Sequence, residues 1–229
     1  MRQHKINIHA LDSINKDIQK HSPHPSLVNI IAVTKAFNYT SILSAQENQL
    51  LCIGENKVQE FLLKKSEKPS IDTGLETHLI GHLQSNKVKK AVELFNVVQT
   101  VDSFKLAQKI NDTAKEKNLH QKIYIQINVG ADPNKHGFML ENIYKTIETI
   151  NNHKHLRLMG LMTILPFYED AQKTQPLFAR MKETQNKTLK DISPTCKFLS
   201  MGMSRDYIYA LKEGATHLRI GTKLYGQRA

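Results

Sequence analysis

Hydrophobic and polar positions divide the chain into two alternating kinds of segment. Short apolar runs rich in Val and Ile recur, and longer segments with helical spacing separate most of them. The apolar runs predict strands at 27–35, 51–56, 78–83, 97–102, 122–129, 156–164, 198–203 and 217–221. The segments between them predict helices at 40–49, 57–66, 85–95, 103–118, 138–152, 169–190 and 204–213.

The segment 103–118 illustrates the helical pattern. Ser103 is a suitable N-cap, and Leu106, Ala107 and Ile110 fall on one face before the helix ends near Asn118. Strands that alternate with helices of this length predict parallel pairing, because each return to the same end of a sheet needs a crossover.

Eight such units favour one closed (β/α)8 barrel of the TIM type, and a doubly wound open sheet, which usually has fewer strands, is the alternative. Only 222–229 follow the last strand, so the eighth helix is missing there. The segment 4–20 has helical spacing and predicts an N-terminal helix that covers this gap. The stretches 66–76 and 131–137 are typical of loops, so we expect 1–229 to form a single domain.

Composition is that of an ordinary globular protein: 229 residues, 40% hydrophobic and 23% charged. No run is long enough to span a membrane, and the N-terminus has no signal-peptide pattern, so we expect a cytoplasmic protein without a membrane partner. Cys52 and Cys196 form no CxxC pair and have no metal-ligand spacing. We interpret both as buried, reduced hydrophobic residues.

The net charge of +11 favours anionic partners, and nucleic acid must therefore be considered. The basic residues are dispersed in short patches such as 64–65 and 87–90, however, and no RNP-like motif, zinc finger or basic heptad occurs. We expect a solvated basic surface and no specific nucleic acid.

Lys35 closes the first apolar run, where a buried strand reaches the rim of the core. Partial desolvation there favours the neutral, nucleophilic amine, as a Schiff-base lysine requires. The alternative is a lysine that simply extends to water.

The ends of strands seven and eight carry glycines and hydroxyls, in 200–204 and 219–222. In (β/α)8 barrels the loops after these strands commonly hold phosphate. Alternatively, Gly202 forms a tight turn and Ser204 only caps the helix 204–213.

Alternation places Arg219 and Gly221 on one face of the last strand. If that face is interior, the guanidinium is a buried cation that needs an acceptor. Asp102, or a heteroaromatic nitrogen of a bound ligand, would serve.

His78 and His82 share a face of the predicted third strand but have no nearby Cys or clear carboxylate partner, so we expect no metal there. Asn56 and His82 lie at the rim, where they can orient a ligand. An aldehyde cofactor carrying a phosphate would use the lysine, the arginine and the phosphate loops together.

The chain resembles, over nearly its whole length, the YggS/PROSC group of pyridoxal 5′-phosphate (PLP)-binding proteins, also called pyridoxal phosphate homeostasis proteins. The motifs that carry the resemblance are Ala32-Val33-Thr34-Lys35, Gly54-Glu55-Asn56-Lys57-Val58-Gln59-Glu60, His78-Leu79-Ile80-Gly81-His82-Leu83-Gln84-Ser85-Asn86-Lys87, Val101-Asp102-Ser103, Gly160-Leu161-Met162-Thr163-Ile164, the segment 199–204 and Arg219-Ile220-Gly221-Thr222.

The resemblance implies a barrel like the N-terminal domain of alanine racemase, with Lys35 forming the internal aldimine. It also implies that Arg219 faces the pyridine nitrogen. Ser200, Gly221 and Thr222 would hold the phosphate with neighbouring amides.

The resemblance further implies that Asn56, His82 and Met201 surround the ring or its substituents. Two stretches depart from the pattern. Relatives usually have Lys-Ser-Gly where this chain has Lys135-His136-Gly137, and many have an acidic pair where it has Arg205-Asp206. We expect neither to touch the cofactor cradle.

An arginine opposite the pyridine nitrogen would keep that nitrogen unprotonated, which weakens the ring as an electron sink and disfavours carbanion chemistry. Racemases that share this barrel add a β-rich domain that supplies a tyrosine, and we expect no such C-terminal domain here. The resemblance thus favours a monomeric, non-catalytic PLP carrier or buffer in vitamin B6 and amino-acid homeostasis, with apo PLP-dependent enzymes as partners. The alternative is a minimal amino-acid racemase with Lys35 as one base.

Overall fold

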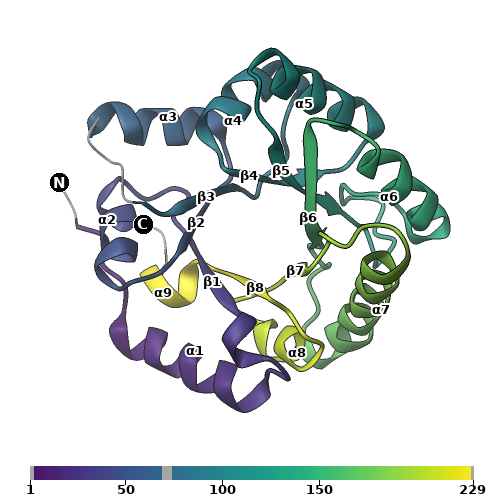
Figure 1. Cartoon of the computed structure of the whole chain (residues 1–229). Helices are drawn as coiled ribbons and strands as arrows, with labels where there is room; N and C mark the ends of the chain where they lie inside the picture. Colours follow the sequence, from purple (N-terminus) through teal and green to yellow (C-terminus); the bar gives the residue numbers. More distant parts are fainter. Residues whose placement is uncertain (1–2, 69–73, 228–229) are drawn as a thin grey trace.

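Eight parallel strands close into a barrel in which each strand pairs with the next and β8 pairs with β1 (Figure 1). The computed structural model describes residues 3–68 and 74–227. The strands are β1 (Asn29–Val33), β2 (Cys52–Glu55), β3 (Glu76–Leu79), β4 (Val97–Val101), β5 (Gln121–Gln126), β6 (Leu156–Met162), β7 (Phe198–Met203) and β8 (His217–Ile220). The predicted (β/α)8 barrel is confirmed.

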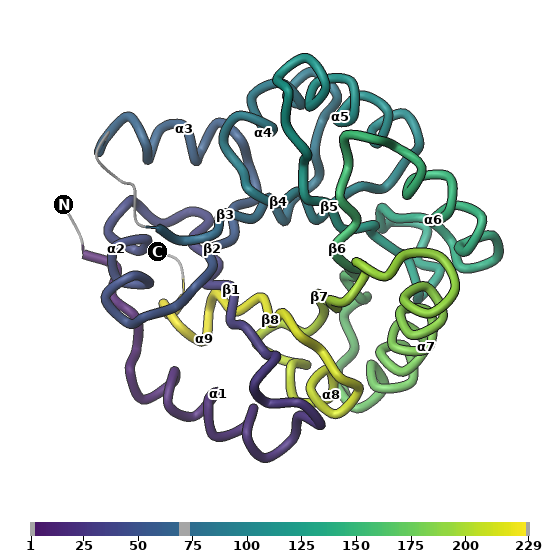
Figure 2. The backbone as a smooth tube through the Cα atoms, viewed as in Figure 1, coloured from purple at the N-terminus to yellow at the C-terminus, as the bar shows by residue number. Residues whose placement is uncertain are grey.

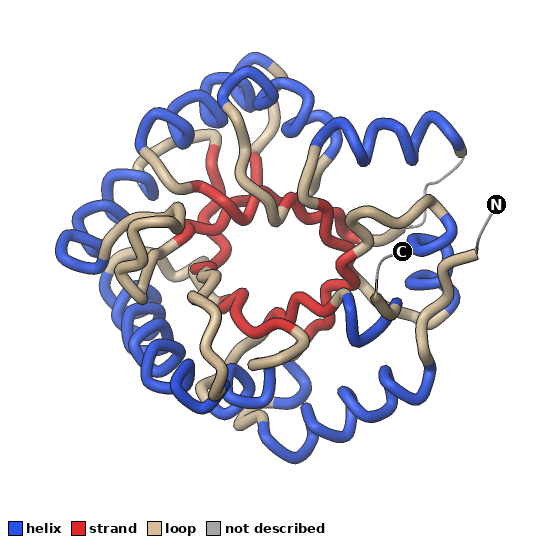
Figure 3. Tube along the Cα trace, turned by 180° about the vertical axis from the view of Figure 1, so that it is seen from behind, coloured by secondary structure: helices blue, strands red, loops and turns tan. Residues whose placement is uncertain are grey.

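Helices form an outer ring around the strands, as the backbone trace and the reverse view both show (Figures 2 and 3). Each buries one face against the barrel. The helices are α1 (Ile8–His21), α2 (Thr40–Glu47), α3 (Val58–Glu67), α4 (Val88–Leu94), α5 (Phe104–Glu116), α6 (Ile143–Asn151), α7 (Gln175–Asp191), α8 (Tyr207–Lys212) and α9 (Thr222–Tyr225).

Helix α1 covers the side of the barrel next to α8 and α9 (Figure 1), which confirms the N-terminal helix that the sequence predicted. Its apolar face is buried and it contacts both α8 and the single turn α9. Asn7 fixes its start, because the Asn7 side chain accepts a hydrogen bond from the N–H of Ala10 and the Asn7 N–H donates to Leu224 O at 2.8 Å.

Several predicted boundaries differ from the observed ones, and those of β3 and α8 bear on candidate site residues. The third strand was placed at 78–83, but β3 begins at Glu76 because this polar segment pairs in register with β2, and it ends at Leu79. His82 is therefore in the following loop and does not share a strand face with His78. Helix α8 begins at Tyr207, so Ser204 does not cap it.

Other local predictions are confirmed. Ser103 caps α5 by accepting from the N–H of Leu106 at 3.3 Å. Cys52 and Cys196 are free and buried, and burial raises the pKa of each thiol to about 12. Within the described residues, no helix is long and apolar enough to cross a membrane.

The main hydrophobic core lies between the barrel and its helices, whereas the inside of the barrel is largely polar. A small apolar cluster of Val97, Tyr124 and Met162 fills part of it. The rest is occupied by side chains such as Gln99 and Arg219, which are 0% and 5% exposed. Buried polar groups of this kind need hydrogen-bond partners, and these hydrogen bonds hold the side chains at the end of the barrel in position.

Candidate functional site

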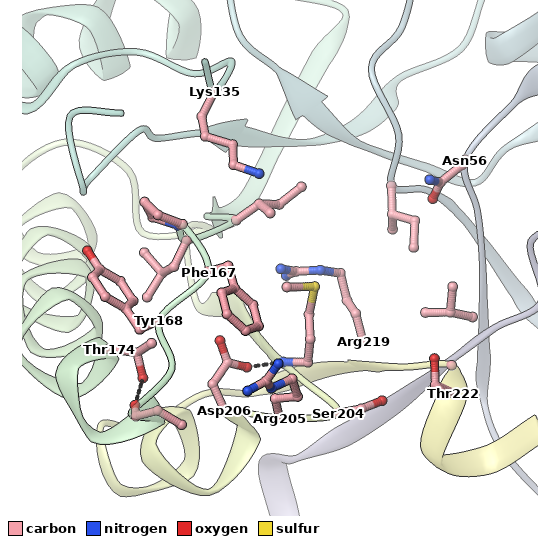
Figure 4. Close-up of a pocket in the computed structure, with 18 of the residues that line it drawn as sticks. Asn56, Lys135, Phe167, Tyr168, Thr174, Ser204, Arg205, Asp206, Arg219 and Thr222 are labelled. Atoms are coloured by element: carbon pink, nitrogen blue, oxygen red, sulfur yellow. Dashed lines mark hydrogen bonds between the residues drawn. The ribbon is translucent and has the colours of Figure 1, made fainter. Parts of the chain in front are cut away.

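A cavity of about 400 Å³ opens at the carboxyl ends of the strands, where ligand sites of (β/α)8 barrels lie (Figure 4). Loops that follow β1, β2, β5, β6, β7 and β8 contribute its walls. Of the site residues predicted from sequence, those that line it are Lys35, Asn56, Arg219, Gly221 and Thr222.

Lys35 lies two residues after the end of β1, is half-buried and lines the cavity wall. Ala36 has a positive φ of 62°, which turns the chain sharply just after it. The N–H of Ala36 donates to a carboxylate oxygen of Glu60, and this bond fixes the turn.

The backbone before Lys35 is held by a buried polar group beneath the cavity. Lys64 Nζ donates to the carbonyl of Thr34 at 2.7 Å and to Glu55 Oε1 at 2.6 Å. The Thr34 hydroxyl donates to the same Glu55 oxygen at 2.6 Å. Burial raises the pKa of Glu55, and the Lys64 charge and hydrogen bond oppose that shift. Hydrogen bonds thus hold the backbone on both sides of Lys35, at Thr34 and at Ala36.

Arg219 extends from β8 into the centre of the cavity (Figure 4). One guanidinium nitrogen donates to Ser200 Oγ at 2.8 Å and the other to the carbonyl of Thr163 at 2.7 Å. Burial lowers the pKa of Arg219 to about 10, and the negative charge of Asp206 partly opposes this. Asp102 was one predicted acceptor for Arg219, and this prediction is wrong: the Asp102 carboxylate instead contacts His82 at 3.0 Å.

A series of hydrogen bonds continues from the Arg219 guanidinium through the barrel interior. Ser200 Oγ, which accepts from the arginine, donates to Gln99 Oε1 at 2.6 Å. The Gln99 amide donates to His78 Nδ1 at 2.7 Å, so His78 carries its proton on Nε2, which lies 3.0 Å from Glu76. Lys122 donates to Glu76 at 2.6 Å.

Glu76 is the last acceptor in this series of hydrogen bonds, at the end of the barrel opposite the cavity. The hydrogen bond from His78 is the largest influence that lowers the pKa of Glu76 to about 2. From Arg219 to Glu76 each group donates to the next, and the orientation of Arg219 is thereby fixed from within the barrel.

Three residues predicted to bind the cofactor do not line the cavity. Ser200 and Met201 are 0% exposed and lie in the interior and the core beneath it. His82 lines a separate pocket, which it shares with Asn56.

The structure also corrects the prediction for two loops. The departures at 135–137 and 205–206 were expected to lie away from the cradle, but Lys135, Arg205 and Asp206 all line the cavity. The reason is that the loops after β5 and β7 fold across the same barrel mouth. Their position after predicted strands was the signal that could have placed them there.

Further lining residues escaped the sequence analysis, among them Phe167 and Tyr168 after β6. Phe167 is 68% exposed, and the Arg205 guanidinium lies 4.2 Å from its ring centre. The N–H of Met203 donates to Asp206 at 2.6 Å, which anchors the loop after β7 (Figure 4). Burial raises the pKa of Asp206.

The end of the cavity near β7 and β8 carries hydroxyls and a glycine. Ser204 Oγ accepts from the N–H of Lys223 at 3.3 Å, and Gly221 and Thr222 lie beside it. Gly202 has φ +90°, and a Cβ there would lie 2.7 Å from Ala210 Cβ. Gly202 therefore allows close packing against α8, and because it lies within β7 it does not form the alternative tight turn.

The lining groups fit an anionic carbonyl compound. Lys35, Lys135, Arg205 and Arg219 carry positive charge, whereas Asp206 is the acidic group among the described lining residues. An amine, a central guanidinium and a hydroxyl-bearing end are the groups needed for an aldehyde, a heteroaromatic ring and a phosphate.

Comparison with known proteins gives consistent relatives. Residues 6–229 match the model of the family described as alanine racemase, N-terminal domain. A pyridoxal phosphate homeostasis protein of Aquifex aeolicus is 33% identical over 219 residues, which cover 96% of this chain and 95% of that protein.

Two solved structures of PipY from Synechococcus elongatus are similar as well. The structure without PLP has a TM-score of 0.85 and 34% identity, and the structure with PLP bound has a TM-score of 0.82 and 32% identity. Each alignment covers 95% of this chain and 99% of PipY.

Proposed function

The chain belongs to the alanine racemase N-terminal domain family and, within it, to the pyridoxal phosphate homeostasis proteins, and we propose that it holds PLP covalently through Lys35. It acts as a carrier or buffer in intracellular PLP and amino-acid homeostasis, without catalysis. The whole chain serves as one cofactor-binding domain, and apo PLP-dependent enzymes are the recipients.

The observation that carries this proposal is the arrangement of Lys35 and Arg219. They come from the adjacent strands β1 and β8 and line one cavity. Lys35 would supply the primary amine, Arg219 would face the ring nitrogen, and Ser204, Gly221 and Thr222 would hold the phosphate. When bound, PLP supplies an aldehyde that condenses with a primary amine with loss of water, and a ring that withdraws electrons.

The buried state of Arg219 supports a carrier over an enzyme. Its pKa of about 10 keeps the guanidinium charged at neutral pH. A second positive charge on a ring nitrogen facing it is unfavourable, so the ring remains a weak electron sink.

The position of Tyr168 also supports a carrier over an enzyme. Tyr168 lines the cavity, but its hydroxyl is directed away from Arg219 (Figure 4). It is therefore poorly placed as an acid or base across the ring.

Borohydride trapping tests the lysine assignment. Wild-type protein incubated with PLP should turn yellow, and after reduction the cofactor should be found on a peptide that contains Lys35. The Lys35→Ala variant should trap none there, whereas Lys57→Ala, at an exposed lysine, should match wild type. Unchanged trapping in Lys35→Ala would refute the assignment.

Two further assays separate the carrier from the minimal racemase. Activation of an apo-enzyme by loaded protein in the presence of a free-aldehyde trap supports direct delivery, and activation abolished by the trap supports a passive reservoir. Rapid, Lys35-dependent loss of the α-deuterium from labelled alanine would instead favour the racemase.

A further inference from the structure

Three side chains with metal-binding atoms meet beside the cavity, each on a different loop. His82 follows β3, Asp102 follows β4 and His136 follows β5. His82 Nδ1 lies 3.0 Å and His136 Nδ1 3.9 Å from the same oxygen, Asp102 Oδ2. One potential ligand atom from each residue lies within 4.8 Å of the other two. The expectation that His82 lacks a carboxylate partner is therefore wrong.

The accessibility of these groups suits an ion that enters from solvent. The Asp102 side chain is 8% exposed, whereas those of His82 and His136 are 45% and 62% exposed. The carboxylate is thus buried, and the two exposed imidazoles have room to rotate. The imidazole rings now stack with centroids 4.1 Å apart.

A second group of possible ligands, Cys52, Glu76 and His78, lies at the opposite end of the barrel but is differently placed. Both nitrogens of His78 are hydrogen-bonded, and Lys122 lies 2.6 Å from Glu76. Burial raises the pKa of Cys52 to about 12, which disfavours the thiolate that a metal needs. This group is therefore a hydrogen-bonded element of the interior.

We propose that His82, Asp102 and His136 form a binding site for a divalent transition cation, with Zn²⁺ as the best fit. Two imidazole nitrogens and one carboxylate oxygen are an established ligand set for Zn²⁺, with water in the fourth position. Ligands about 2.0–2.1 Å from a tetrahedral Zn²⁺ stand about 3.3 Å apart. The distances of 3.0 and 3.9 Å to Asp102 bracket this value.

The structural change needed is small and local. Both rings must rotate out of their stack so that each nitrogen lone pair points at the ion, and their exposure permits this. A bound ion would join the loops after β3, β4 and β5. Because Lys135 lies next to His136 and lines the cavity, this joint would stiffen one side of the cavity mouth.

Calorimetric titration of ZnCl₂ into chelator-treated protein without a histidine tag or PLP tests the site. Wild type should bind one ion saturably. His136→Phe keeps the ring stack and removes both nitrogens, and binding should weaken by at least about tenfold. Asp102→Asn should weaken it similarly. His9→Asn, at an exposed histidine outside the group, should bind as wild type does.

Two further measurements use only the wild-type protein, so they do not depend on whether a variant folds. Zn²⁺ should raise the melting temperature, because it binds the native state. It should also shift the side-chain NMR signals of two histidines. Absence of saturable binding, or equal affinity in a folded His136→Phe, would overturn the proposal and leave a purely hydrogen-bonded group. The titration is independent of PLP binding, so its failure would not affect the proposed function.

Discussion

Arg219 and Ser200 lie on neighbouring strands and share a hydrogen bond of 2.8 Å inside the barrel. Because the Ser200 oxygen accepts from the guanidinium, its own proton goes to Gln99. Hydrogen bonds in the barrel interior thus orient the Arg219 guanidinium in the cavity before any ligand enters. This relationship makes Ser200 a positioning residue for Arg219.

Ser200→Ala should destabilise the protein by about 1–3 kcal/mol, because it leaves buried polar atoms of Arg219 and Gln99 without a partner. Urea unfolding measures this loss, and PLP titration should show weaker binding. Ser66→Ala, at an exposed helix position, should change the free energy of unfolding by less than about 0.5 kcal/mol. Equal stability of the two variants would contradict the role of Ser200.

Lys64→Met should cost about 3–5 kcal/mol, because Glu55 is left as an unpaired buried carboxylate. The double variant Lys64→Met/Glu55→Leu should recover much of the loss. Lys65→Met should cost less than about 1 kcal/mol, because it removes only a surface contact with the Phe61 ring. Thermal and urea unfolding of the three variants give the comparison. No difference between Lys64→Met and Lys65→Met would count against the buried pair.

Stability should fall in mild acid because of His217. Burial lowers the pKa of His217 from 6.5 to about 3. Between these values the unfolded chain binds a proton that the folded protein does not, so stability decreases as the pH falls through this window. The loss from pH 7 to pH 5 should be about 2 kcal/mol. Urea unfolding at a series of pH values measures it.

His217→Phe should flatten this pH profile, whereas His9→Asn should retain the wild-type slope. Glu76 acts in a different window: its pKa is lowered to about 2, so its stabilising contribution is lost only as the pH falls below about 4.5. A wild-type profile that is flat from pH 7 to pH 5 would contradict the burial of a neutral His217.

Gly81→Ala should displace the loop after β2. A Cβ at this position would lie 2.3 Å from the carbonyl oxygen of Asn56, which is backbone and cannot rotate away. We expect a loss of about 1–3 kcal/mol in stability and weaker PLP binding, since Asn56 lines the cavity. Urea unfolding and PLP titration measure the two effects. An unchanged free energy of unfolding and an unchanged PLP affinity would contradict the prediction, because the loop would then move without cost.

The sequence predicted the barrel and the end of β1 because these depend on local patterns. Strand count, helix spacing and the place of Lys35 all follow from hydrophobic periodicity. The start of β3 was missed because Glu76 is polar, and only its register with β2 makes it part of the sheet.

The interior contacts could not be predicted in this way. Ser200 and Gln99 are 101 residues apart and meet only because the barrel closes. Asp102 is one of two acceptors that chemistry alone suggests for Arg219, and the sequence does not show which groups the folded barrel brings to the guanidinium. The contact of Asp102 with His136 likewise depends on how two loops cross the mouth.

The packing of α1 has a consequence for how the protein is made. Its N-terminal end bonds Leu224, and its Asp17 bonds the hydroxyl of Tyr207. Helix α1 thus completes these contacts only after partners that lie roughly two hundred residues later in the chain have been translated, and contacts of such separation form slowly. The side of the barrel that α1 covers is therefore completed only once α8 and α9 have been synthesised.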